Sequence, residues 1–111
     1  MNVNFSEILE KQKKYFESGA TLPVDARIAA LKKLKGVILS REEEICAALK
    51  EDLGKSSYES YMCEVGMTLA EISYMIKHTR AFARTKTVPT PMSQAIAKSY
   101  VKKSPYGCVL I

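Results

Sequence analysis

Apolar residues in the first half of the chain recur at intervals of three and four, the spacing of one face of an α-helix. This pattern predicts three helices: one that Asn4 could cap and that runs to about Ser18, one from Pro23 to about Leu39, and one from Arg41 to Leu53. Gly19 and Gly54 are expected to end the first and the third, because glycine readily adopts the left-handed conformation that follows a helix. The first half of the chain is therefore expected to be helical.

The most regular pattern lies between Tyr58 and Arg84 and predicts a fourth, long helix. Its apolar positions alternate steps of three and four: Met62, Val65, Leu69, Ile72, Ile76, Thr79 and Ala83. A line of this kind is typical of a helix that packs along other helices. We therefore expect these residues to form the buried side of the fourth helix.

Two short motifs predict where helices begin. Ser40 with Glu43, and Ser56 with Glu59, have the spacing of a capping box. In such a box the serine hydroxyl accepts a hydrogen bond from the amide three residues on, and the glutamate side chain can reach back to the serine. We expect the third and fourth helices to start at these motifs.

The pattern changes after Arg84. Pro89 and Pro91 favour extended backbone in the residues before them. Residues 95–103 then predict a half-exposed strand, Pro105-Tyr106-Gly107 a turn, and Cys108–Ile111 a buried second strand. The expected fold is mainly α, with four helices and a C-terminal β-hairpin. Because the last strand needs a sheet and covering helices that these residues do not supply, we expect the N-terminal piece of a larger α/β protein.

Charge is unevenly distributed along the chain, whose formal net charge is +5. Glu71 is the last acidic residue, and seven basic residues follow it. Such a stretch indicates either a nucleic-acid surface or solvated element edges. The edges are the preferred interpretation, and no nucleic acid is expected.

Cysteine usage and hydropathy indicate whether a metal site, a disulfide or a membrane segment is to be expected. The chain has three cysteines, with no pair at metal-ligand spacing, so no metal site is expected. Unpaired cysteines in apolar surroundings indicate a reducing compartment, and we expect a cytoplasmic protein. No apolar run approaches the roughly 20 residues that cross a bilayer, and no membrane segment is expected here.

Three stretches together resemble the start of an NAD(P)-dependent aldehyde dehydrogenase of the class 3, fatty-aldehyde-type branch. They are EDLGKSSYESYMCEVGMTLAEISYMIKHTRAFA, VPTP and SYVKKSPYGCVLI, and the likeness extends back to VDARIAALKKLKGVI. One departure is Phe82, where many members have Trp. The resemblance implies oxidation of aldehydes to carboxylic acids with NAD or NADP, through attack by a cysteine thiolate and a thiohemiacetal.

The resemblance also implies a domain organisation. Residues 1–88 would be the N-terminal helical part of the cofactor-binding domain. Residues 89–111 would be a linker and strand hairpin, first part of the subunit-association sheet and then the first strand toward the cofactor domain. The catalytic domain would lie outside these residues, and a homo-oligomer that takes an aldehyde substrate is implied.

Site residues are few on this interpretation. None of the three cysteines matches the family's nucleophile, so no catalytic or cofactor-binding residue is expected and the chain alone should be inactive and bind no cofactor. His78, with no acidic neighbour within a turn, is expected to be a surface residue. By resemblance, Cys63 and Met67 would face the aldehyde tunnel, where methionine adapts to varied apolar ligands. Plain helix packing is the alternative for both.

A second function class remains open from the sequence. The chain could be a stand-alone basic helical module that binds an acidic partner or a nucleic acid. The closing GCVLI favours the enzyme segment, because a stand-alone module has no reason to end inside a buried strand.

Overall fold

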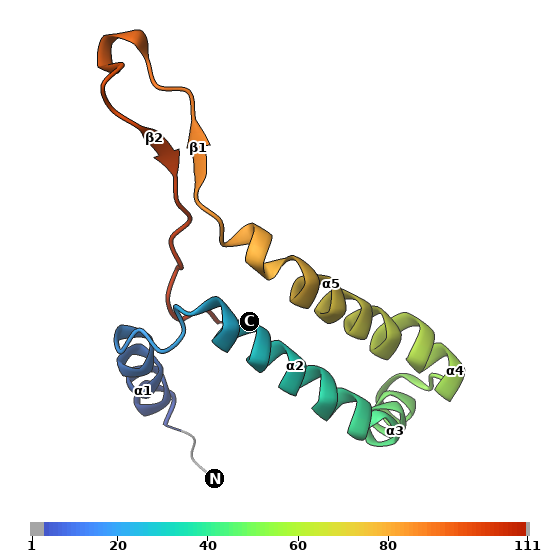
Figure 1. Ribbon diagram of the computed structural model, residues 1–111. Coiled ribbons are helices and arrows are strands. Elements are labelled where there is room, and N and C mark those ends of the chain that lie inside the picture. The colour runs from blue at the N-terminus through green and yellow to red at the C-terminus, as the bar shows by residue number, and fades with distance from the viewer. Residues whose placement is uncertain (1–3, 111) are drawn as a thin grey trace. The chain divides into compact units, whose positions relative to one another are not determined.

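A computed structural model describes residues 4–110 of the chain. The chain divides into two compact units, one of residues 27–79 and one that combines residues 1–26 with residues 80–111. Figure 1 labels the helices and strands. Their bounds are α1 Phe5–Glu17, α2 Val24–Ser40, α3 Glu42–Leu53, α4 Ser57–Ser60, a π-helical turn Tyr61–Val65, α5 Gly66–Phe82, β1 Lys86–Val88, a 3₁₀ turn Met92–Gln94 and β2 Ser99–Val101.

The predicted fold class is confirmed: helices fill the four expected regions, and a two-stranded antiparallel hairpin follows them. Two helix starts form as the sequence predicts. The Asn4 side chain accepts a hydrogen bond from the Glu7 amide at 3.3 Å, and the Ser56 hydroxyl accepts one from the Glu59 amide at 3.2 Å. Gly54 ends α3 with a φ of 68°. These short-range signals determine their local structure without help from distant residues.

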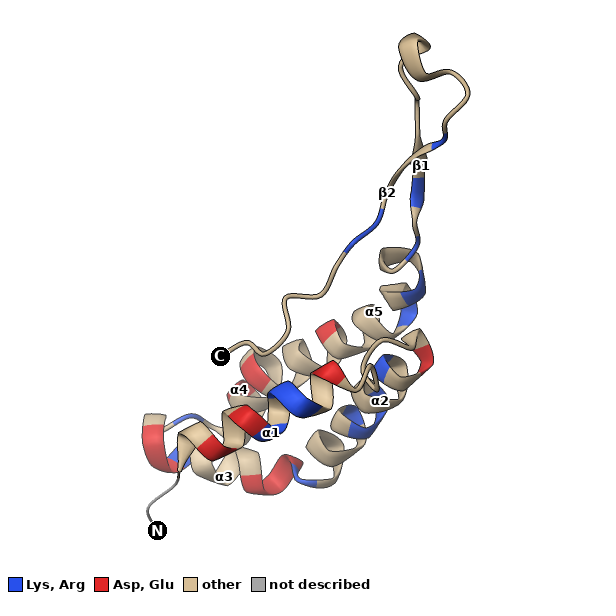
Figure 2. Cartoon of the chain, turned by 90° about the vertical axis from the view of Figure 1, so that its left-hand side faces the viewer, with Lys and Arg blue, Asp and Glu red and all other residues tan. Residues whose placement is uncertain are grey.

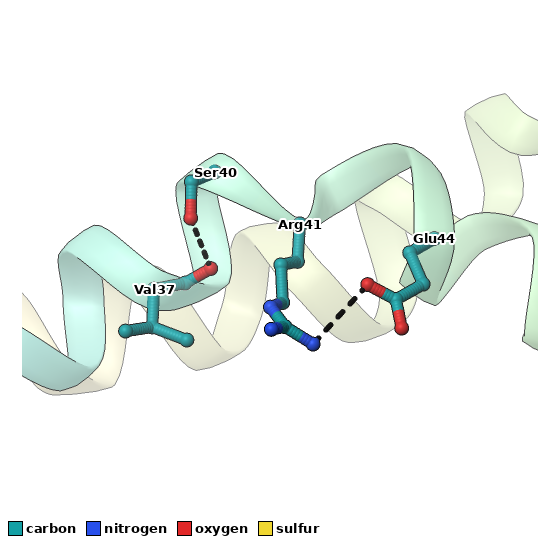
Figure 3. A network of polar contacts seen from close by, with 4 residues as sticks. All are labelled: Val37, Ser40, Arg41 and Glu44. Carbon is teal, nitrogen blue, oxygen red and sulfur yellow. Dashed lines mark hydrogen bonds and ion pairs between the residues drawn. The ribbon is translucent and has the colours of Figure 1, made fainter.

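The capping box predicted at Ser40 is wrong. α2 continues through Ser40, so the Ser40 hydroxyl donates back to the Val37 carbonyl at 2.9 Å instead of accepting from the next helix (Figure 3). α3 begins at Glu42 with no side-chain cap. Beside this junction, an Arg41 guanidinium nitrogen lies 3.4 Å from a Glu44 carboxylate oxygen. Because α2 extends one residue further than predicted, Ser40 lies inside a helix and does not cap α3.

The long fourth helix is one helical run whose winding changes along its length. Its buried residues, here called the buried seam, are Ser60, Val65, Leu69, Ile72 and Thr79. Ser60 and Val65 are five residues apart, because the π-turn, defined as Tyr61–Val65, adds one residue to the turn between them. Met62, predicted for the buried side, is instead 53% exposed. That prediction assumed regular α-helical winding throughout.

α2 and α5 lie side by side within the unit of residues 27–79 (Figure 1), and a polar contact joins them. The Lys35 ammonium donates to the Ser73 hydroxyl at 2.8 Å, and that hydroxyl donates to the Leu69 carbonyl at 2.5 Å. Both hydrogen bonds are partly buried. The Ser73 hydroxyl therefore acts both as a donor within its helix and as an acceptor between helices.

The hairpin belongs to the other unit and pairs β1 with β2 in antiparallel register. Lys86 lies opposite Val101, and Val88 lies opposite Ser99. The Ser99 amide also donates to the Thr90 hydroxyl at 3.1 Å. Basic residues and no acidic ones accompany this hairpin along its length (Figure 2).

The prediction of which residues form the hairpin strands is partly wrong. Only Ser99–Val101 of the predicted strand 95–103 is extended, and its partner comes from Lys86–Val88, before the prolines. The prolines lie in the loop between the strands, where a missing N–H removes no ladder hydrogen bond. Residues 108–110 form no strand, so Pro105-Tyr106-Gly107 does not join two strands; Ile111 lies outside the described residues.

Contacts within this second unit are polar or superficial. Arg80 forms an ion pair with Asp25, and the Lys103 ammonium lies 5.5 Å from the centre of the Phe82 ring. Gly107, with a φ of 97°, lies against the Phe16 ring. In the described parts of this unit, residues 4–26 and 80–110, no residue is buried.

Candidate functional site

The π-turn is the most unusual local feature of the unit of residues 27–79, and Gly66 permits it. The Gly66 amide donates to the carbonyl of Tyr61, five residues back. A Cβ added at Gly66 would lie 2.9 Å from that carbonyl oxygen and 3.4 Å from Cε1 of the Tyr61 ring. The first distance is shorter than real contacts allow, so any other residue would force the backbone to move. Single π-turns of this kind are frequent at functional sites.

Cys63 and Met67, predicted to face the substrate, both lie on the surface of this unit. Cys63 is exposed within the π-turn, and Met67 is 63% exposed in the first turn of α5. Residues four apart on a helix are neighbours on one face. Their spacing of four along one helical run favours a shared face, and the described residues bury neither side chain.

An ion pair fixes the π-turn to the loop that follows α3. The Lys55 ammonium lies 2.5 Å from a carboxylate oxygen of Glu64, and the Lys55 side chain is largely covered. The hydrogen bond to Glu64 raises the pKa of Lys55 above its usual value, and the nearby Cys63 and Glu59 act in the same direction. Lys55 is therefore charged at neutral pH and holds Glu64 beside the exposed face of Cys63.

The remaining histidine and cysteine side chains lie on other parts of the chain: His78 on α5, Cys46 on α3 and Cys108 after β2. The His78 ring stacks on Tyr74 with 4.2 Å between ring centres, on the partly exposed side of α5. Cys46 and Cys108 are half-buried and, like Cys63, form no disulfide. Within residues 4–110 no cluster of three His, Cys, Asp or Glu side chains could hold a metal ion.

A shallow open hollow lies at the junction of α2 and α3, lined by residues 39–44. Ser40 supplies a hydroxyl group to this hollow, and that hydroxyl already donates to the Val37 carbonyl (Figure 3). A serine nucleophile needs an adjacent base, and no histidine lines the hollow. The hollow therefore offers no chemistry beyond its carboxylates.

The described strands do not form a dinucleotide site. Such a site places the phosphates at the start of a helix that directly follows a parallel strand. β1 and β2 are antiparallel, and neither leads into an α-helix. The described residues therefore do not fit NAD or NADP. The same residues contain no helix with both the length and the hydropathy needed to cross a membrane.

Sequence reasoning singled out Cys63 and Met67 but missed the π-turn and the ion pair that lie beside them. The π-turn was not predicted, because the apolar positions fit an ordinary α-helix without it. The available signal was Gly66, a helix-breaking residue in the middle of an otherwise regular pattern. The Lys55–Glu64 pair joins residues nine apart across a loop, and sequence spacing alone gives no sign of it.

A similar fold occurs in a solved structure described as the substrate-bound state of Staphylococcus aureus AldH. The two chains share 38% identity and a TM-score of 0.90, over 96% of this chain and 23% of that one. The aldehyde dehydrogenase family model matches residues 2–111. The chain belongs to the aldehyde dehydrogenase family, as its resemblance implied.

Characterised relatives include family 3 members. The chain is 42% identical to the 4,4'-diaponeurosporen-aldehyde dehydrogenase of Staphylococcus aureus over 89% of its length, and 36% identical to the dimeric NADP-preferring aldehyde dehydrogenase of Canis lupus familiaris over 96%. It is 35% identical to the aldehyde dehydrogenase family 3 protein comG of Dictyostelium discoideum. It spans only 22–23% of the length of these relatives.

Proposed function

We propose that this chain is the helical and hairpin portion of an enzyme that oxidises aldehydes to carboxylic acids with NAD or NADP. The observation that carries the proposal is the match to aldehyde dehydrogenases over nearly all of the chain, at the level of both sequence and fold. The coenzyme, when bound, supplies the hydride acceptor. We place its binding outside residues 4–110, because they lack the strand-to-helix turn that holds its phosphates.

The nucleophile of the proposed reaction is a cysteine thiolate, which forms a thiohemiacetal with the aldehyde. A catalytic cysteine needs surroundings that favour its thiolate, together with donors for the developing oxyanion. Cys46 lies within α3 and Cys108 follows β2, and both are half-buried. We therefore assign the chemistry to the part of the family's fold that this chain does not match, and expect the 111-residue chain alone to be inactive.

The substrate side of the proposal concerns the face that carries Cys63 and Met67. We propose that these two side chains form part of the wall along which the aldehyde enters. Their exposure within their own unit supports this role, because a wall residue must not be used up in helix packing. A flexible thioether and a small thiol suit a wall that accepts aliphatic tails of varied shape.

The hairpin is proposed to serve subunit association, in a homo-oligomer located in the cytoplasm. Residues 1–88 would then belong to the cofactor-binding domain and residues 89–111 to the linker and association segment. The hairpin exposes the apolar side chains of Met92, Ile96, Tyr100 and Val101, and each of its two strands has an unpaired edge that could pair with another chain. The three unpaired cysteines agree with a reducing compartment.

A chimera tests the enzymatic proposal. Residues 4–110 would replace the matching segment of the Staphylococcus aureus relative, which supplies the rest of the fold, and coenzyme reduction would be followed with a series of aldehydes. We expect turnover by the chimera and none by the 111-residue chain. A correctly folded chimera without activity, or activity of the chain alone that Cys63→Ser abolishes, would contradict the proposal.

The same chimera tests the wall. Met67→Trp is expected to lower kcat/KM for long-chain aldehydes about tenfold more than for short ones, because a bulky ring narrows an apolar path. Met75→Trp, the same substitution at an exposed methionine two turns further along α5, is the matched control. It should change kcat/KM for neither the long-chain nor the short-chain aldehydes. Equal effects of the two substitutions would show that Met67 does not form part of the wall of the aldehyde path.

A further inference from the structure

The helix around the π-turn can be wound in two ways, and sequence and structure favour different ones. In regular α-helical winding, Met62 would precede Val65 by three residues and join the buried seam. In the structure, Ser60 occupies that seam and Met62 is 53% exposed. The π-turn makes the difference, because it allows residues five apart, Ser60 and Val65, to share one face.

The observed winding carries two local disadvantages. The Ser60 side chain is fully buried, and its hydroxyl finds no hydrogen-bond partner among the described residues. A buried hydroxyl without a partner is unfavourable. Met62, which could fill the same line with apolar atoms, remains in solvent. Regular winding would reverse both features, by exposing the Ser60 hydroxyl and burying Met62.

Gly66 favours the observed winding. Without a side chain, the residue leaves room for both the carbonyl and the ring of Tyr61, which pack against its Cα. The Lys55–Glu64 ion pair then holds the π-turn from outside, at 2.5 Å. An added methyl group at Gly66 would strike the Tyr61 carbonyl and remove the advantage of the π-turn.

We propose that residues 60–66 form a two-register element in which Gly66 selects the π-register, and that Gly66 thereby positions the exposed face of Cys63 and Met67. In the π-register four consecutive residues, 61–64, lie between two buried positions of the seam. In a regular α-helix, where buried positions are three or four residues apart, at most three residues lie between them. The turn thus adds one outward side chain to this face. The register stands on the geometry alone; its effect on an aldehyde path rests on the proposed function.

Thiol reporters test the register without any aldehyde. In a Cys63→Ser chain, Ser60→Cys and Met62→Cys would each be labelled with maleimide and read by peptide mass spectrometry, where Cys46 and Cys108 fall in other tryptic peptides. We expect position 60 to react about tenfold more slowly than position 62, because only position 60 is buried. With Gly66→Ala added, this order should reverse. An unchanged order would overturn the proposal.

A deletion covers the case in which Gly66→Ala exposes both positions by unfolding the chain. Deleting Met62 from the Gly66→Ala chain removes the extra residue, so Ser60 and Val65 become four apart and the seam is continuous in ordinary α-helix. The deletion should restore the urea midpoint lost by Gly66→Ala, about 1 M. Deleting the exposed Ala70, where winding is regular, should abolish the cooperative transition. Failure of the Met62 deletion to restore the midpoint would overturn the proposal.

The positioning role has its own readout in the chimera. Gly66→Ala, with the Met62 deletion to preserve the fold, should shift KM for long-chain aldehydes about threefold or more and leave kcat for short ones unchanged. An unchanged KM alongside reversed thiol reporters would overturn the positioning role. A chimera that is inactive before any substitution would contradict the proposed function instead, and the thiol reporters would still decide the register.

Discussion

The two units of the chain use apolar residues in opposite ways. All the buried residues among those described lie in the unit of residues 27–79, along the buried seam of α4, the π-turn and α5. In the other unit, large apolar side chains such as Met92, Ile96 and Leu110 are almost fully exposed. The helical unit therefore has an internal source of stability, whereas the hairpin unit presents its apolar surface outward.

This difference shows that the same hydrophobic pattern can serve two purposes. In the helical unit, apolar atoms removed from water stabilise the fold by about 25 cal/mol per Å². The exposed residues of the hairpin unit contribute nothing of the kind to the isolated chain. Exposed apolar surface of this extent is typical of segments that meet another surface, which agrees with the association proposed for the hairpin.

The largest expected effect is the loss of seam packing. Leu69→Ala or Ile72→Ala should lower the free energy of unfolding by about 2–5 kcal/mol, because each leaves a cavity in the buried seam. Leu110→Ala makes the same change at a leucine that is 98% exposed, in the other unit, and should cost less than about 0.5 kcal/mol. Urea denaturation followed by circular dichroism measures all three. Similar losses at Leu69 and Leu110 would erase the distinction between the units.

A smaller effect of opposite sign is expected at Ser60. Ser60→Ala removes a buried hydroxyl that has no partner among the described residues, so it should raise the free energy of unfolding by about 1 kcal/mol. Ser73→Ala is the matched control, since the Ser73 hydroxyl bonds to both Lys35 and the Leu69 carbonyl, and its loss should destabilise the chain by about 1 kcal/mol. Destabilisation by both substitutions would mean that Ser60 has a partner after all.

Removing the hairpin should have less effect still on the helical unit. A chain that ends at Thr85 lacks both strands but keeps the whole buried seam. Its free energy of unfolding should change by less than about 1 kcal/mol, since none of the described residues in the removed segment, 86–110, is buried. Light scattering on the same pair should show a larger particle only for the chain with the hairpin. Loss of the cooperative unfolding transition on truncation would show that the units depend on each other.

Sequence reasoning worked best where structure is local. The caps at Asn4 and Ser56 and the end of α3 at Gly54 follow from residues within one turn of each other, and all three formed as predicted. The choice of helical regions and of a terminal hairpin also succeeded, as did the family resemblance. Each of these depends on patterns that survive without knowledge of the neighbouring element.

It failed where one extra residue or a distant partner decided the outcome. A single additional residue in α2 turned Ser40 from a cap into a helix residue. A single extra residue in the π-turn replaced Met62 by Ser60 in the buried seam. The partner of β2 is Lys86–Val88, eleven or more residues earlier, and a pairing across a proline-containing loop has no local signature. Periodicity gives the type of element but not these shifts in register.

The smallest expected effect on stability comes from the Lys55–Glu64 pair. Unlike the contribution of the buried seam, its contribution should depend on pH. The hydrogen bond to Glu64 raises the folded-state pKa of Lys55 above the usual 10.5. A group with a raised pKa stabilises the fold fully below its unfolded pKa, and this contribution disappears as the pH rises through the folded value. The urea midpoints of the native chain and of Lys55→Gln should therefore differ by a constant amount between pH 7 and about pH 10, and converge above it. Glu64→Gln should give the same convergence, whereas Leu69→Ala should keep its deficit at every pH. A difference between the native chain and Lys55→Gln that persists unchanged to about pH 11.5 would show that the lysine acts through packing of its aliphatic stem and not through its charge.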